Sequence, residues 1–277
     1  MSDVRAGMAQ VLVEPGEREA NLARAGEAVR RAALSGCDVV VLPECLDLGW
    51  THESARTRAT TVPGPVTGVL AGLAAGNGVV LAAGLVERSG ERIHNSAVLV
   101  SDRGELLLHH RKVNELDFAR RLYSTGSTLG VAETPFGVVG LDICADNSPS
   151  SLALGHSLGL MGAQLVLSPS AWAVPPDHDD HAEPYGAMWR ESYGALARAH
   201  RMSVVGVSNV GPVVGGDWDG WRCIGCSLAV GPDGEVLAQG SYGERAEELL
   251  VVTVPVGRAA GPGRPEGPGS WVVPCGS

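Results

Sequence analysis

The strongest constraint on the fold is an alternation of short, β-branched apolar runs with longer stretches of helical periodicity. The clearest run, CDVVVL at 37–42, is closed by Pro43, which is typical of a strand buried on both faces. The alternation continues along the chain, with helices expected at 18–35, 66–75, 150–162 and 185–200 and strands at 4–13, 78–86, 95–100, 105–110, 138–143, 164–167, 203–207 and within 226–239. The sequence therefore predicts an α/β fold with some hairpins mixed in.

The domain organisation follows from length and from the Gly/Pro distribution. The 277 residues are 44% hydrophobic and 19% charged, which suits one large globular core. No internal repeat and no linker interrupts residues 1–256, so we expect one domain there. Residues 257–277 are rich in Gly and Pro and cannot support a helix or a central strand, so we expect a C-terminal tail.

Charge and cysteine usage exclude several classes of function. The net charge is −10 and no run of Lys or Arg occurs, which argues against nucleic acid and anionic membranes as partners. No apolar stretch reaches 18 residues and the N-terminus lacks the layout of a signal peptide, so we expect a cytoplasmic location. Six cysteines are too few for a disulfide framework in a chain of this length. The expected partner is a small molecule.

Three residues able to do chemistry follow predicted strands directly. Glu44 comes after the strand at 37–42, Lys112 after that at 105–110, and Cys144 after that at 138–143. In sheets of this kind the C-terminal ends of the strands form the edge where sites are built. A free thiol has a pKa near ~8.5 and needs a base or cation beside it to become a nucleophile. The three side chains would form such a set if they converge.

The segments around these residues resemble a known family. VVVLPE at 39–44, HRKV at 110–113 and GLDICAD at 140–146 are similar to the three catalytic signatures of the nitrilase superfamily of carbon-nitrogen hydrolases, in the same order. The resemblance covers about residues 4–253. It implies a four-layer α-β-β-α sandwich that assembles into a homodimer or a larger homo-oligomer, with no metal and no organic cofactor.

The resemblance also implies roles for individual residues. Glu44 would be the general base, Lys112 the electrostatic stabiliser and Cys144 the nucleophile, with the backbone N–H of Ala145 as a second oxyanion donor. Tyr123 matches an aromatic-containing segment of the family and is expected at the substrate. The pair Ala145-Asp146 resembles members that cleave amides, whereas members that cleave nitriles have Trp-Glu after the cysteine. We therefore predict an amidase.

One part of the family pattern is displaced. Where members carry a second glutamate between the lysine and the cysteine, this chain has Arg120 and Arg121. Glu115 is the nearest glutamate and is our candidate for the positioning carboxylate. Because of this departure, a catalytically weak binding protein is one alternative to an amidase. A second alternative is an acyltransferase that forms the same thioester and transfers the acyl group to an amine instead of water.

Three other features of the sequence each allow a simpler interpretation. Trp172 is expected to wall the substrate pocket, with core packing as the alternative, and the polar loop that runs to Pro184 is expected to cap that pocket. CIGC at 223–226 and PDHDDH at 176–181 resemble parts of metal sites. The first lacks a second ligand pair and the second suits an exposed loop, so we predict no metal.

Overall fold

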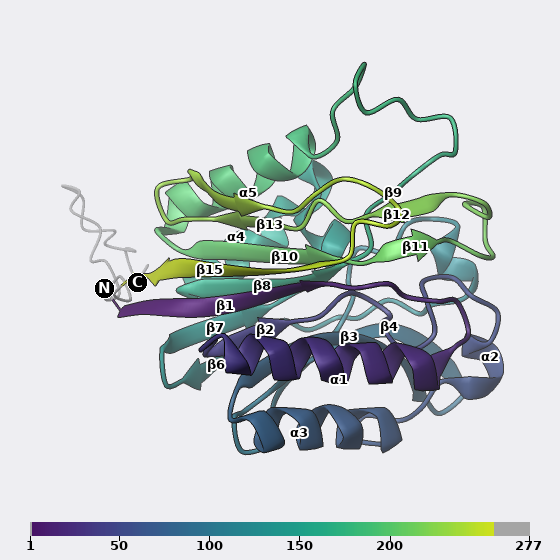
Figure 1. The fold of residues 1–277 in the computed structure, drawn as a ribbon, viewed down its shortest axis with the longest axis horizontal. Coiled ribbons are helices and arrows are strands. Elements are labelled where there is room, and N and C mark those ends of the chain that lie inside the picture. The colour runs from purple at the N-terminus through teal and green to yellow at the C-terminus, as the bar shows by residue number, and fades with distance from the viewer. Residues whose placement is uncertain (1, 258–277) are drawn as a thin grey trace, which may run out of the picture.

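Two six-stranded sheets form the centre of the molecule (Figure 1). The computed structural model describes residues 2–257. The first sheet has the order β15-β1-β2-β3-β4-β5, in which β1, β2 and β3 are parallel and the other neighbours antiparallel. Its strands are β1 (Ser2–Gln10), β2 (Val39–Val41), β3 (Val80–Ser89), β4 (Arg92–Val100), β5 (Leu106–Arg111) and β15 (Glu248–Val256).

The second sheet repeats this plan with the order β14-β13-β10-β8-β7-β6. Its central strands β7, β8 and β10 are parallel, and antiparallel strands lie on both sides of them. The strands are β6 (Val131–Thr134), β7 (Gly137–Leu141), β8 (Leu165–Ser170), β10 (Ser203–Ser208), β13 (Leu228–Val230) and β14 (Val236–Gln239). The two sheets pack face to face, so their central strands are buried on both faces.

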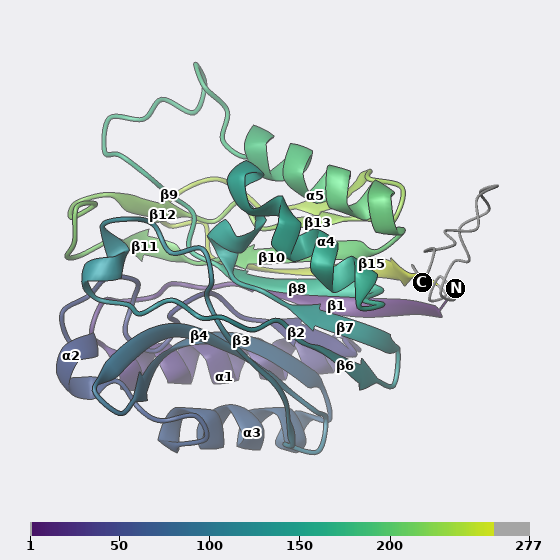
Figure 2. The same cartoon turned by 180° about the vertical axis from the view of Figure 1, so that it is seen from behind.

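Helices cover the two outer faces (Figures 1 and 2). Helices α1 (Arg18–Leu34) and α3 (Pro65–Asn77) lie on the first sheet, and α4 (Leu152–Leu160) and α5 (Ala187–His200) lie on the second. Helix α1 turns one stripe inward, Asn21, Ala25, Ala28, Val29 and Ala32. The order helix, sheet, sheet, helix confirms the predicted four-layer α-β-β-α sandwich.

Short elements gather at one end of the sandwich, where the parallel strands finish. A three-stranded sheet has the order β11-β12-β9. The loops at this end also contain helix α2 and three 3₁₀ helices. The bounds of these elements are β9 (Ala173–Val174), β11 (Val210–Pro212), β12 (Arg222–Ile224), α2 (Ala55–Arg58), η1 (Ala119–Arg121), η2 (Cys144–Asn147) and η3 (Pro149–Ser151).

The expected elements are present with shifted ends, and some strands were missed. The helix expected at 150–162 begins with the 3₁₀ turn η3, so α4 starts at Leu152. Strand β6 was not predicted because its four residues, VAET, give too short an apolar pattern. Strand β15 was missed although its sequence, ELLVVTVPV, contains a continuous apolar run. None of the helices in the described part of the chain has the length and apolarity needed to cross a membrane. Beyond Gly257 the expected tail lies outside the described residues, and the division of the chain at 256 stays a prediction.

Candidate active site

Cys144 lies on a sharp turn directly after β7. It begins the 3₁₀ helix η2 and has a φ of 46°, a left-handed conformation that is unusual for any residue other than glycine. Its backbone N–H donates to Oγ of Ser168 on the neighbouring strand β8, at 3.2 Å. The side chain is 8% exposed and faces a pocket. The turn thus holds the thiol at the end of the second sheet, at the wall of a cavity.

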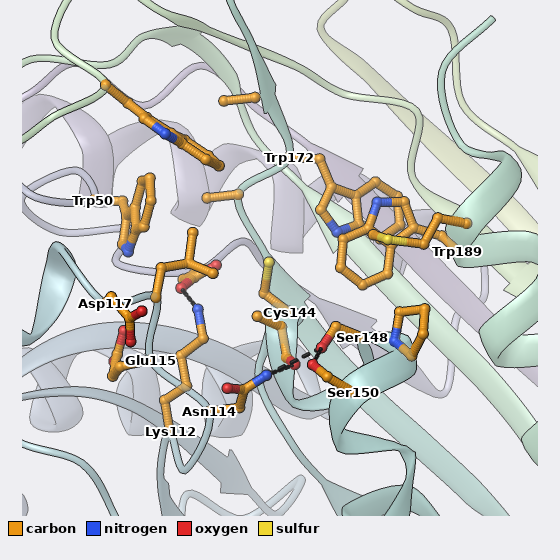
Figure 3. A pocket seen from close by; sticks show the side chains of 18 of the residues that line it. Trp50, Lys112, Asn114, Glu115, Asp117, Cys144, Ser148, Ser150, Trp172 and Trp189 are labelled. Carbon is orange, nitrogen blue, oxygen red and sulfur yellow. Dashed lines mark hydrogen bonds and ion pairs between the residues drawn. The ribbon is translucent and has the colours of Figure 1, made fainter.

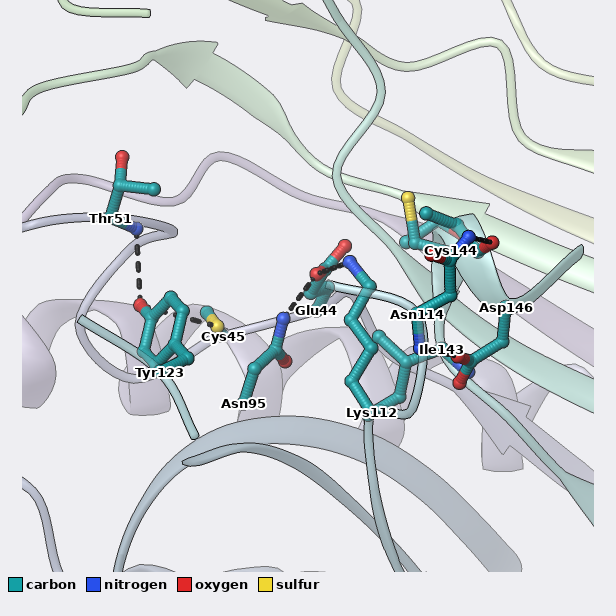
Figure 4. Close-up of polar contacts among 12 residues, drawn as sticks. Glu44, Cys45, Thr51, Asn95, Lys112, Asn114, Tyr123, Ile143, Cys144 and Asp146 are labelled. Carbon is teal, nitrogen blue, oxygen red and sulfur yellow. Dashed lines mark hydrogen bonds and ion pairs between the residues drawn. The ribbon is translucent and has the colours of Figure 1, made fainter. Parts of the chain in front are cut away.

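Glu44 and Lys112 form a buried ion pair contributed by the first sheet (Figure 4). Nζ of Lys112 donates to Oε1 of Glu44 at 2.7 Å, and Nδ2 of Asn95 donates to the same oxygen at 2.5 Å. The two charged residues are only 1% and 2% exposed. The backbone N–H of Glu44 donates to the carbonyl of Ser170 on β8, at 3.1 Å. The carboxylate is therefore fixed relative to both sheets.

Gly84 on β3 allows this placement. A Cβ atom built at Gly84 would lie 2.5 Å from Cα of Glu44 and 2.8 Å from the carbonyl oxygen of Pro43. Only glycine lets the strand approach the backbone of Glu44 so closely.

Electrostatics define the resting state of the three groups. Burial raises the pKa of Cys144 above its usual range, the charge of Glu44 raises it further, and Lys112 acts against both. Burial is the largest single effect on Lys112 and opposes its charge, but Glu44, Cys144 and Glu115 together outweigh burial and raise the lysine's pKa well above its usual value. At neutral pH the site therefore contains a charged Lys112 beside Glu44 and a protonated thiol, which needs a base at the moment of attack.

Glu115 lies in the same pocket. Its side chain is 1% exposed, and neither carboxyl oxygen has a hydrogen-bond partner among residues 2–257. Burial raises the pKa of Glu115 to about 8, against the opposing effect of Lys112. The carboxyl group is thus mostly protonated at pH 7 and has both a donor and an acceptor available. Glu115, the candidate from the sequence, therefore lies in the pocket. Arg121, which stands near the place where family members carry the second glutamate, pairs with Asp217 instead.

A hydrogen-bonded network joins the segment after Lys112 to the turn of Cys144. Asp146 accepts from the backbone N–H groups of Val113 and Asn114, at 3.1 and 2.7 Å, and lies 2.8 Å from Nε2 of His110. Nδ2 of Asn114 donates to the carbonyl of Ala145 at 2.7 Å. Sequence reasoning used Asp146 only to separate amide from nitrile cleavage, and did not anticipate that it ties the two signatures together.

The pocket has a volume of about 570 Å³ and brings most of the predicted site together (Figure 3). Ala145 and Trp172 line it, as expected. Trp50, six residues after Glu44, and Trp189 on α5 also line it, although neither was predicted to bind substrate. The lining residues are Glu44, Trp50, Lys112, Asn114, Glu115, Leu116, Asp117, Arg120, Cys144, Ala145, Ser148, Pro149, Ser150, Ala171, Trp172, Ala173, Tyr185, Met188, Trp189 and Trp218.

Tyr123 is not in the pocket. It is 1% exposed, and its hydroxyl accepts from the backbone N–H of Thr51 at 3.1 Å and lies 3.8 Å from the thiol of Cys45 (Figure 4). The ring packs in an apolar cluster behind Glu44 and holds the loop that follows it. The prediction of substrate contact fails because the family match located the segment and not the direction of the side chain.

The two motifs considered for metals lie elsewhere. His178, Asp179, Asp180 and His181 line a separate cavity of about 560 Å³ and are not among the residues that line the pocket of Cys144. Cys223 and Cys226 are buried free thiols. Within residues 2–257, no three His, Cys, Asp or Glu side chains are grouped so that they could hold a metal ion.

Comparison with known proteins decides the family. The model of the carbon-nitrogen hydrolase family matches residues 5–261. The chain belongs to the carbon-nitrogen hydrolase family. This hydrolase is 30% identical to a nitrilase of Pyrococcus abyssi over 86% of its own length and 84% of the relative. It is 29% identical to an omega-amidase of Xenopus tropicalis, with 86% and 85% covered.

Solved structures agree on the fold of this hydrolase. The amidase of Nesterenkonia sp. AN1 superposes with a TM-score of 0.77 at 23% identity, covering 91% of this chain and 93% of that one. A mutant of that amidase carries acrylamide, added at its active-site cysteine, and matches with the same TM-score at 22% identity. The family assignment confirms the predicted enzyme class, a cysteine-dependent hydrolase of carbon-nitrogen bonds.

Proposed function

We propose that this carbon-nitrogen hydrolase is an amidase that cleaves small amides or N-carbamoyl compounds through a thioester on Cys144. The convergence of Cys144, the Glu44–Lys112 pair and Glu115 in one pocket carries the proposal. The relatives named amidase support an amide over a nitrile.

In the first half-reaction Glu44 takes the proton of Cys144, and Sγ attacks the amide carbon. The carbonyl π electrons move to oxygen, where the ammonium of Lys112 and the backbone N–H of Ala145 stabilise the charge. When the tetrahedral intermediate collapses, the C–N bond breaks and Glu44 donates its proton to the leaving amine. The products are ammonia or an amine and an acyl-thioester.

In the second half-reaction water attacks the thioester. Glu44 accepts a proton from the water, the same two donors hold the oxyanion, and the C–S bond breaks. The carboxylic acid leaves and the thiol is protonated again. Glu115, protonated below pH 8, orients the substrate amide or the water through the donor and acceptor that the described protein leaves unused.

The test measures ammonia release from a panel of aliphatic amides, ω-amides and N-carbamoyl amino acids, together with the intact mass of the protein. We expect turnover of at least one class and an acyl adduct on Cys144, both abolished in Cys144→Ala. Turnover retained by Cys144→Ala would refute the mechanism. No ammonia and no adduct with any compound would favour the weak binding protein, and a new amide formed from an added amine would favour the acyltransferase.

We also propose that the enzyme works without a metal or organic cofactor, in the cytoplasm, as a homodimer or larger homo-oligomer. The proposed chemistry uses only side chains and backbone of this chain, which supports the first point. The family resemblance supports the assembly. Light scattering coupled to size exclusion measures the oligomeric state, and activity after dialysis against a chelator tests the first point.

A further inference from the structure

We infer that the substrate of this site is an uncharged amide with a large apolar group, aromatic in size, and not the monoamide of a dicarboxylic acid. The inference rests on the proposed amidase function and adds the chemical class of the substrate. Its basis is the wall of the pocket and the pairing of the charges around it.

Tryptophan is concentrated at this pocket to an unusual degree. Aromatic residues make up only 4% of the chain, yet four of its six tryptophans line the one cavity that contains Cys144. Buried aromatic side chains contribute large apolar area and prefer partners that offer a π face or an apolar edge. A site for a small polar amide needs no such wall.

One group of rings lies beside Cys144. Trp172 stacks on Trp189 with centroids 5.0 Å apart and planes at 17°. Nε1 of Trp189 donates to the hydroxyl of Tyr185 at 3.0 Å, which fixes the orientation of the indole. Met188, 42% exposed on α5, lines the same side. This wall is rigid at its base, and at Met188 it has a flexible thioether that can adapt to a ligand.

The second group lies across the pocket. Trp50 contacts Trp218 edge-on with a centroid distance of 5.2 Å, and Trp218 stacks on Trp221 at 4.1 Å. Figure 3 shows Trp50 on one side of Lys112 and Cys144, with Trp172 and Trp189 on the other. The reacting atoms therefore lie between two aromatic surfaces.

The buried cation of the pocket is already paired with a carboxylate. The cations of the pocket are Lys112, which pairs with Glu44 at 2.7 Å, and Arg120, which is half exposed and lies 3.6 Å from Asp117. Glu115 adds a third acid. A carboxylate placed beside Lys112 would lose its hydration and compete with Glu44, which is unfavourable. Arg120 could offer it only a solvent-exposed contact, which contributes little.

Two buried indole N–H groups of the pocket wall have no hydrogen-bond partner. Nε1 of Trp172 and Nε1 of Trp50 have no hydrogen-bond partner among residues 2–257, and the two side chains are 1% and 7% exposed. Buried N–H groups in folded proteins are almost always paired. Neutral acceptors, such as the carbonyl oxygen of an amide, satisfy them without bringing a second charge into the pocket.

The experiment compares three primary amides that all release ammonia: phenylacetamide, succinamate and propionamide. We expect kcat/KM for phenylacetamide to exceed both others by at least about 10-fold, because each methylene in an apolar pocket is worth roughly that factor. We also expect phenylacetamide to bind Cys144→Ala and to change its tryptophan fluorescence, which needs no turnover. Equal or faster hydrolysis of succinamate would overturn the inference and leave the amidase function intact. Failure of all three amides, without an adduct on Cys144, would overturn both.

Matched variants test the wall. Met188→Ala should lower kcat/KM for phenylacetamide by about 5-fold and change propionamide less than about 2-fold. Met161→Ala is the control, since Met161 is similarly exposed, at 46%, and lies outside the pocket. Arg120→Ala tests the alternative, in which this pocket residue binds a substrate carboxylate. Selective loss of succinamate hydrolysis in Arg120→Ala, with succinamate the better substrate of the parent, would instead assign Arg120 to a carboxylate and refute the inference.

Discussion

The buried pair of Glu44 and Lys112 gives a quantitative prediction. Both side chains are at most 2% exposed. Removing one partner therefore leaves the other buried, with neither its partner nor solvent to stabilise it. Breaking such a pair destabilises a fold by about 3–5 kcal/mol, whereas replacing both partners with neutral groups of similar size is often close to neutral. We therefore expect Glu44→Gln and Lys112→Met each to lose about 3 kcal/mol, and the double variant to recover most of it.

In a domain of this size 3 kcal/mol lowers Tm by about 6–12 °C. The assay is thermal and urea unfolding of the four proteins, followed by circular dichroism, with ammonia release measured in parallel. All three variants should lose activity by at least about 10³-fold, because general-base catalysis and the lysine charge are both required. Stability and activity thus separate in the double variant.

The pH dependence of stability gives an independent check. In the parent the pKa of Lys112 is raised, so the pair stabilises the fold below the pKa of an unfolded lysine, about 10.4, and this contribution is lost as the pH rises through the folded pKa. In Glu44→Gln burial dominates and lowers the lysine's pKa. That variant should therefore gain stability relative to the parent as the pH approaches about 10. The expected fall in Tm of each single variant is at least about 6 °C. Single variants whose Tm stays within about 1 °C of the parent, or a double variant in which the two losses add, would refute the reasoning.

Three further predictions concern single residues. Because the pKa of Glu115 is raised to about 8, kcat/KM should fall above pH 8 as the carboxyl ionises, and Glu115→Gln should flatten this limb; an unchanged limb would contradict the assignment. Tyr123→Phe should lower stability by about 1–3 kcal/mol, since it leaves the N–H of Thr51 unpaired, and keep KM within about 2-fold; a large rise in KM would place the ring at the substrate. Gly84→Ala should displace Glu44 and lower kcat by about 10²-fold in a folded protein, whereas Gly72→Ala on α3, with open space at its Cβ, should keep parent activity.

Local sequence located the candidate site residues better than it located all of the strands. Glu44, Lys112 and Cys144 could be found because each follows a strand directly, and the C-terminal ends of parallel strands meet by geometry. Strand β6 is only four residues long and has no clear apolar pattern, whereas the apolar run of β15 is typical of a strand and could have been recognised.

Side-chain direction and long-range contact were beyond local reasoning. Trp50 and Trp189 are 139 positions apart and share one pocket because the loop after β2 and the start of helix α5 reach the same end of the sandwich. Tyr123 lies in the expected segment but points into the cluster around Cys45. The residues adjacent to Tyr123 do not determine whether its ring points to the substrate pocket or to this cluster, since either direction buries an aromatic ring.

The reactive groups come from different sheets: Glu44 and Lys112 follow β2 and β5, and Cys144 follows β7. Neither sheet alone has both a nucleophile and a base, so no fragment containing one sheet can retain partial turnover. Catalysis is consequently a reporter of sheet docking. During refolding, activity should return with the tertiary signal and lag any early gain of secondary structure.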